Sequence, residues 1–223
     1  MTDAKTGRTT DSTTPGTVSD LDAMTHASLD QLEAYYDKWS ESYEEDLLGM
    51  GYDAPQRAAA AMNERGIDHA QPVLDAGCGT GLTGLHLRKI GFEHITGVDY
   101  STVSLEKARR KGCYAELKRL NLNEPLDFAD DWFAAAQCVG TLTYVDNIPG
   151  LMREFCRVVR PGGIVSFTHR LDLYDDGFRS ALREIEEVGT WASIHHSEPR
   201  AYIPDHDDFG DDKAIIYDMY RVN

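Results

Sequence analysis

The stretch VLDAGCGTG at residues 73–81 decides the fold of this chain. Residues 73–76 are a short apolar run, which predicts a buried strand, and residues 80–90 have the pattern of a helix. The turn between them contains three alternate glycines, Gly77, Gly79 and Gly81. Glycine lets the backbone approach a ligand closely, and the first turn of the helix offers free N–H groups to an anion. The stretch therefore predicts a nucleotide-type site where a strand passes into a helix.

Two aspartates flank this turn. Asp99 ends the next predicted strand, residues 95–99, where a carboxylate can accept both hydroxyls of a ribose. Asp75 stands just before the glycines, where it repels a pyrophosphate and attracts an ammonium. S-adenosylmethionine carries an ammonium, a carboxylate and a ribose, so the charges favour this cofactor and its product S-adenosylhomocysteine.

Two alternatives stay open. Gly79, Gly81 and Gly84 also satisfy G-x-G-x-x-G, the pattern of an NAD-dependent oxidoreductase, although this register starts beyond the expected end of the strand. The other alternative is a non-catalytic protein that binds S-adenosylmethionine or S-adenosylhomocysteine without turning it over.

Strands and helices alternate along the rest of the chain. Further strands are expected at residues 114–120, 134–139, 164–168, 191–195 and 214–220, and helices at 101–111, 148–160 and 177–188. This alternation predicts an α/β fold with a Rossmann-like, doubly wound, mostly parallel sheet and helices on both faces. Residues 1–27 are polar and are expected to be a disordered tail, followed by a single domain at 28–223 whose first part, 28–66, is a helical lid.

The composition excludes several classes of protein. The chain has 223 residues and a net charge of −16, which disfavours binding to nucleic acid and to anionic membranes. No apolar run is long enough to cross a bilayer, no secretory leader is visible, and the four cysteines show no paired spacing. We therefore expect a cytoplasmic monomer or homodimer. The acidic surface is equally consistent with salt adaptation and with an ordinary acidic protein.

The chain resembles the class I S-adenosylmethionine-dependent methyltransferases. The resemblance rests on residues 73–81, on GVDYS at 97–101 and on RPGG at 160–163. More narrowly, YDKW at 36–39, Gly51-Tyr52 and VGTLTY at 139–144 resemble the Williams–Beuren syndrome chromosome region methyltransferase-like proteins. The resemblance implies a seven-stranded sheet with its last strand antiparallel, and a cofactor site at the carboxyl ends of the first, second and fourth strands.

The resemblance also implies roles for individual residues. The turn would consist of Gly77, Cys78, Gly79 and Gly81, with Asp75 near the methionine ammonium and Asp99 on the ribose. Tyr100 would pack on adenine, Asn121 and Leu122 would lie at its amino group, and Gly140, Thr141 and Leu142 would lie near the sulfonium. Asn121 and Ala134 stand where the family usually has Asp.

Three aromatic residues precede the glycine turn. Tyr36, Trp39 and Tyr43 are spaced i, i+3 and i+7, which predicts one face of a single helix. Two roles are open for these rings: a lid that faces the sulfonium, or ordinary packing on the core.

The reactive groups are less clearly marked. Tyr144 and His169 follow predicted strands and are the weak candidates for a catalytic base. The segment Asp205–Asp208 could hold a metal ion, but a solvated loop is the simpler reading, and no metal is expected. The basic residues at 107–111 are read as ordinary charges at a helix C-terminus rather than as an RNA site. The sequence predicts direct, in-line methyl transfer to a small molecule.

Overall fold

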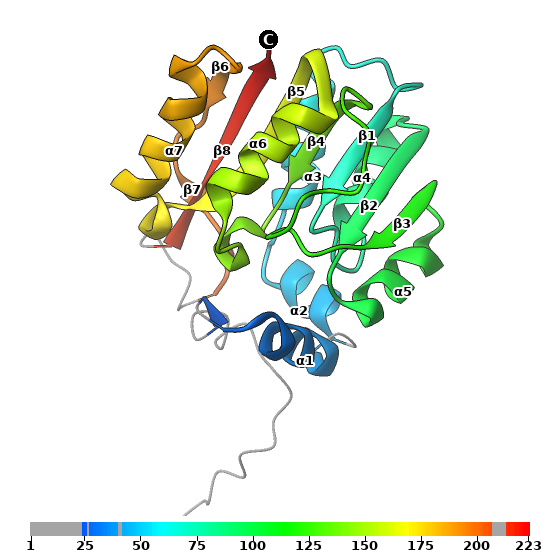
Figure 1. Cartoon of the computed structure of the whole chain (residues 1–223). Coiled ribbons are helices and arrows are strands. Elements are labelled where there is room, and N and C mark those ends of the chain that lie inside the picture. The colour runs from blue at the N-terminus through cyan, green and yellow to red at the C-terminus, as the bar shows by residue number, and fades with distance from the viewer. Residues whose placement is uncertain (1–23, 26, 40–41, 207–212) are drawn as a thin grey trace, which may run out of the picture.

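A mixed sheet of eight strands crosses the centre of the computed structural model, which describes residues 24–25, 27–39, 42–206 and 213–223 (Figure 1). Seven strands follow the order β3-β2-β1-β4-β5-β8-β6, and β7 pairs with β8 beside this path. The strands are β1 (Pro72–Ala76), β2 (His94–Asp99), β3 (Glu116–Arg119), β4 (Phe133–Cys138), β5 (Val159–Arg170), β6 (Trp191–His196), β7 (Arg200–Ala201) and β8 (Ala214–Val222).

The pairing of the strands confirms the predicted Rossmann-like fold class. Neighbouring strands pair in parallel along the part of the sheet ordered β3-β2-β1-β4-β5. In contrast, β8 runs antiparallel to β5, β6 and β7. Strand order reverses between β1 and β4, and in such sheets ligands bind at the carboxyl ends of the strands next to this reversal. The two-residue strand β7 was not predicted, because so short a segment carries no periodicity.

Helices cover both faces of the sheet (Figure 1). Buried side chains of β1, β2 and β4 pack on one face against α3 and α4, and on the other face against α6 and α7. The helices are α1 (Leu29–Trp39), α2 (Tyr43–Gly49), α3 (Ala54–Asn63), α4 (Leu82–Ile90), α5 (Thr102–Lys111), α6 (Ile148–Val158) and α7 (Asp176–Glu187). Every residue of β4 is buried because it lies between neighbours on both sides and helices on both faces.

The helices α1 and α2 lie at the carboxyl ends of the parallel strands, below the sheet in Figure 1. Asp37 of α1 accepts a hydrogen bond from Ser101, and Glu44 of α2 pairs with Lys111 of α5, so both helices contact the region that follows β2. Met24, inside the expected tail, packs against the same apolar cluster as α1, while residues 1–23 and 26 lie outside the described residues. In the described part of the chain, no helix has the length and apolar character needed to cross a membrane.

Candidate cofactor and acceptor site

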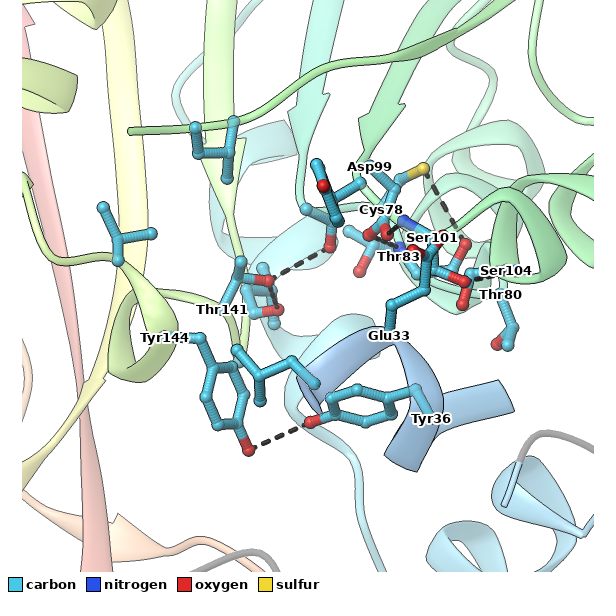
Figure 2. A pocket seen from close by; sticks show the side chains of 18 of the residues that line it. Glu33, Tyr36, Cys78, Thr80, Thr83, Asp99, Ser101, Ser104, Thr141 and Tyr144 are labelled. Atoms are coloured by element: carbon cyan, nitrogen blue, oxygen red, sulfur yellow. Dashed lines mark hydrogen bonds between the residues drawn. The ribbon is translucent and has the colours of Figure 1, made fainter. Parts of the chain in front are cut away.

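A cavity opens where α1 and α2 meet the carboxyl ends of β1, β2 and β4 (Figure 2). The structure brings most of the predicted site residues to its wall. These are Tyr36, Tyr43, Gly77, Cys78, Gly79, Asp99, Tyr100, Asn121, Leu122, Gly140, Thr141 and Tyr144. Five other predicted residues do not line it: Trp39, Asp75, Gly81, Leu142 and His169.

The glycine turn forms one wall of the cavity and needs glycine for two reasons. Gly77, Gly79 and Gly81 all have positive φ, at 72°, 51° and 96°, which side chains of L-residues rarely adopt. A Cβ on Gly79 would meet nothing within 4 Å, so its backbone faces open space, whereas a Cβ on Gly77 would lie 2.3 Å from the hydroxyl of Thr141. The turn therefore offers bare backbone to a ligand at Gly79 and lets Thr141 approach closely at Gly77.

Asp99 ends β2 and holds the turn in place. Its Oδ2 accepts the N–H of Gly79 at 2.8 Å, and its Oδ1 accepts the N–H of Ser101 at 2.9 Å. Burial raises the pKa of this carboxyl, and the N–H groups oppose that rise because they stabilise the charged form. A carboxylate oxygen has more than one lone pair, so both oxygens can still accept the hydroxyls of a ribose.

Aromatic and polar groups surround the position expected for adenine. Tyr100 lines the cavity, and the Arg119 guanidinium lies 4.5 Å from the centre of its ring. Glu33 of α1 also lines the cavity and pairs with Arg119, so α1 contacts this end directly. Asn121 Oδ1 accepts the N–H of Asn123, which leaves one lone pair of this oxygen for an adenine amino group.

Asp75 stands behind the turn rather than in the cavity wall. It is only 1% exposed, its Oδ2 accepts the hydroxyl of Tyr114 at 2.7 Å, and burial raises its pKa to about 7. Its Oδ1 is buried and has no hydrogen-bond partner among the described residues, and the same holds for the hydroxyl of Thr80, which lines the cavity. Unpaired buried polar atoms of this kind fit a ligand that brings hydrogen-bond donors, such as the ammonium of S-adenosylmethionine.

The opposite end of the cavity is lined by phenols. The hydroxyl of Tyr36 donates to that of Tyr144 at 2.9 Å, and the ring of Tyr36 stands edge-on to Tyr43 and Tyr144, with centres 5.8 and 5.9 Å apart (Figure 2). Tyr52 lines the same cavity. Desolvation by burial raises the pKa of all four phenols. They therefore stay protonated at neutral pH.

The predicted single helix bearing three aromatic residues is wrong. Tyr36 and Trp39 belong to α1, which ends at Trp39, whereas Tyr43 begins α2. Trp39 is 1% exposed and its indole N–H donates to Asp46 of α2, so it packs between the helices while the two tyrosines reach the cavity. Leu142 likewise lies in the core against α6 rather than in the cavity wall.

The two candidate bases differ in position. His169 is 4% exposed and packs on Phe178 of α7 with ring centres 4.3 Å apart, which places it on the far face of β5 from Thr168. Desolvation lowers its pKa to about 4, so it is a weak base as well as a distant one. Tyr144 does line the cavity, but its raised pKa makes it a hydrogen-bond donor rather than a base.

Sequence reasoning missed several residues of the site. Glu33, Tyr52 and Thr80 line the cavity; Tyr52 and Thr80 lay in quoted motifs but had no predicted role, and Glu33 lay in none. Tyr114 explains Gly84, because a Cβ there would lie 2.2 Å from the Tyr114 ring. The third glycine of the dinucleotide pattern thus has a packing role inside α4.

Metal binding gains no support. The described residues contain no group of three or more His, Cys, Asp and Glu side chains arranged to hold a metal ion. Of the segment Asp205–Asp208, the last two residues lie outside the described part of the chain.

Comparison with known proteins agrees with this geometry. Residues 73–163 match the family of the methyltransferase domain. The chain is 32% identical over 167 residues to methyltransferase-like protein 27 of Homo sapiens, covering 72% of this chain and 68% of the relative. It is 28% identical over 195 residues to a demethylmenaquinone methyltransferase of Tropheryma whipplei, covering 84% and 80%. An S-adenosylmethionine-dependent methyltransferase from Mesorhizobium loti shares the fold, with a TM-score of 0.59, 19% identity and coverage of 73% and 96%.

The fold, the glycine turn and the carboxylate at the tip of β2 define a nucleoside-binding α/β protein. The chain belongs to the S-adenosylmethionine-dependent methyltransferases, as the match to methyltransferase-like protein 27 shows. Its cofactor is S-adenosylmethionine.

Proposed function

We propose that this protein transfers a methyl group from S-adenosylmethionine to a small-molecule acceptor. The observation that carries this proposal is that one cavity has both a nucleotide end, at Gly79 and Asp99, and a phenol-lined end, at Tyr36 and Tyr144 (Figure 2). A concave cavity partly covered by α1 and α2 suits a small acceptor better than a folded macromolecule. One relative, the demethylmenaquinone methyltransferase, is named for a small acceptor.

The protein's contribution would be alignment and exclusion of water. When bound, the cofactor supplies an electrophilic methyl group that needs no further activation. Asp99 would fix the ribose, the N–H groups at the start of α4 would hold the carboxylate, and the ionised Asp75 would favour the ammonium. Holding donor and acceptor in line in this way can lower the barrier by roughly 7–11 kcal/mol.

We infer that α1 and α2, within the expected lid at residues 28–66, cover this cavity. Glu33 accepts the N–H of Thr102 and pairs with Arg119, while Glu44 pairs with Lys111. Ion pairs of this kind contribute about 0–1 kcal/mol each, so buried side chains such as Trp39 and Leu47 hold these helices on the core more strongly than the ion pairs do. A single domain at 28–223, a cytoplasmic location and a monomer or homodimer stay predictions.

The test is incubation of the protein with methyl-labelled S-adenosylmethionine and a small-metabolite extract, followed by identification of the labelled product. The matched control is Asp99→Ala, which removes the ribose contact. Label in a small molecule with the wild type and little with the variant supports the proposal. Label in protein or nucleic acid alone, when whole-cell extract is used, refutes the small-molecule acceptor.

The same material separates the two alternatives. Binding of S-adenosylhomocysteine in calorimetry, with no label transferred to any extract, would identify a non-catalytic binding protein. Binding of NAD in preference to S-adenosylhomocysteine would identify an oxidoreductase, although Gly84 already has a packing role against Tyr114.

A further inference from the structure

Among the described residues, none at the acceptor end of the cavity is suited to take a proton. The titratable side chains that line it are Tyr36, Tyr43, Tyr52 and Tyr144, all with pKa values raised by desolvation. The carboxylates among the described lining residues are at the nucleotide end and already accept hydrogen bonds, Asp99 from Gly79 and Glu33 from Thr102. An alcohol, a phenol or a protonated amine would therefore find no base here to remove its proton.

An anionic acceptor is also disfavoured. The chain carries a net charge of −16, which repels anions as they approach. Arg170 is close enough to lower the pKa of Tyr144 and Tyr202, opposing the larger effect of burial, but it makes two hydrogen bonds to Asp172. This pair brings no net charge to offset the desolvation of a carboxylate.

The phenols instead provide rings and hydroxyl oxygens from several segments. The lining phenols come from α1, from α2, from the loop before α3 and from the turn after β4, and Tyr202, the residue after β7, packs against one of them. The Tyr52 and Tyr202 rings stand edge-on with centres 5.6 Å apart. Their hydroxyls converge on Gly140, at 3.0 and 3.5 Å from the position that a Cβ would take there. The faces of aromatic rings attract a positive charge that has lost its water.

We propose, resting on the methyltransferase function above, that this end selects a nitrogen nucleophile that is uncharged when it attacks: a tertiary amine or an aromatic ring nitrogen. The nitrogen lone pair forms the bond to the methyl carbon, the carbon–sulfur bond breaks, and its electron pair stays on sulfur. No proton moves, and the positive charge passes from sulfur to nitrogen. The tyrosines face a cation before and after the transfer, so one environment serves both states.

The test uses two-ring probes of similar size with the protein saturated in S-adenosylhomocysteine. N-methylisoquinolinium represents the methylated cation, naphthoate an anion and naphthol a neutral hydroxyl compound. A cation over aromatic rings gains about 0.5–2 kcal/mol, so calorimetry should show the cation binding about ten-fold more tightly than naphthoate. Equal binding, tighter binding of naphthoate or naphthol, or no binding of the cation overturns the proposal.

Two substitutions separate the ring of Tyr144 from its hydroxyl. Tyr144→Phe keeps the ring and should bind the cation within about two-fold of the wild type, whereas Tyr144→Leu should lose several-fold. A loss in the Phe variant as large as in the Leu variant would show that the hydroxyl, not the ring, holds the probe, and would overturn the proposal. Tyr220→Phe is the matched control, because Tyr220 stacks on Trp191 and does not line the cavity.

The result also distinguishes this inference from the function beneath it. A variant that binds S-adenosylhomocysteine is folded. If Tyr144→Leu does not bind S-adenosylhomocysteine, the proposal is judged from the wild type's preference among the three probes and from the Phe variant. A wild type that binds no S-adenosylhomocysteine refutes the methyltransferase function. A wild type that binds it but not the cation refutes the acceptor class alone.

Discussion

Replacing Asp75 by Asn should change both the stability and the cofactor affinity of this protein, each with its own pH dependence. The carboxyl is buried behind the glycine turn, accepts one hydrogen bond from Tyr114, and has its pKa raised to about 7. Asparagine keeps an oxygen for the Tyr114 hydroxyl and removes the charge. Its amide would lie beside the buried side chain of Gln137, which pairs with Asp75 across β1 and β4 and has no hydrogen-bond partner among the described residues.

The stability effect follows from the pKa of Asp75 in the folded and unfolded states. In the unfolded chain this carboxyl ionises near its model value of 3.8, so the unfolded state loses its proton first as the pH rises. The contribution of the neutral carboxyl is fully present below pH 3.8 and is lost as the pH rises to about 7. A rise of about three units corresponds to about 4 kcal/mol, of which about 2–3 kcal/mol falls between pH 5 and pH 8.

The binding effect has the opposite direction. An ammonium is favoured by the ionised carboxylate, and at pH 6 a group with a pKa of about 7 is only about one-tenth ionised. At each pH, the affinity of the wild type for S-adenosylhomocysteine is divided by that of the Asn variant. This ratio should be about ten-fold lower at pH 6 than at pH 8. This ratio removes every titration that the two proteins share, including that of the cofactor's own amino group.

Urea unfolding and calorimetry at pH 5, 6, 7 and 8 test both statements, with the exposed Asp127→Asn as the matched control. The Asn variant should gain about 2–3 kcal/mol of stability relative to the wild type across this range. A stability difference that stays constant with pH would refute the claim that burial raises the pKa of the Asp75 carboxyl. A constant affinity ratio would refute the role of Asp75 toward the ammonium.

Three further predictions concern the turn and the sheet. Asp99→Ala should weaken binding of S-adenosylhomocysteine by about 1.5–3 kcal/mol in calorimetry, since it removes charged hydrogen bonds, and an unchanged affinity would contradict its place on the ribose. Gly77→Ala should lower the unfolding midpoint in urea well below that of Gly162→Ala, because both have positive φ but only at Gly77 does the new Cβ collide with a neighbour; equal midpoints would contradict this. Tyr174→Phe should cost about 1.5–3 kcal/mol in urea unfolding, because it removes the hydroxyl that donates to the buried carboxylate of Asp218 at 2.7 Å; no loss would show that this bond adds nothing.

The fold could be predicted because its signals are local. Apolar runs and helical periodicity can be recognised from residues that are close together in the sequence. In the same way, the position of Ser101 before α5 predicted a cap, and its side chain does cap that helix. The seven main strands were all expected, with boundaries that differ by a few residues at most, apart from β5, which starts earlier, at Val159.

The candidate site was less predictable where packing between residues far apart in the sequence determines the position of a side chain. The spacing of Tyr36, Trp39 and Tyr43 fits one helix, but the chain forms two, and the indole is used to pack them together. His169 follows an apolar strand, yet which face it takes depends on the register of β5 with β8 and on α7, and neither is visible in sequence. Tyr114 illustrates the same limit, since its contact with Asp75 joins residues that are 39 positions apart.

The placement of Glu33 and Tyr36 on a single helix has a consequence for the order of events. These residues are one turn of α1 apart, and they lie at the nucleotide end and the phenol end of the cavity, respectively. Any outward displacement of α1 exposes both ends together. A motion of α1 would therefore act on both ends of the cavity in the same step, rather than on one end after the other.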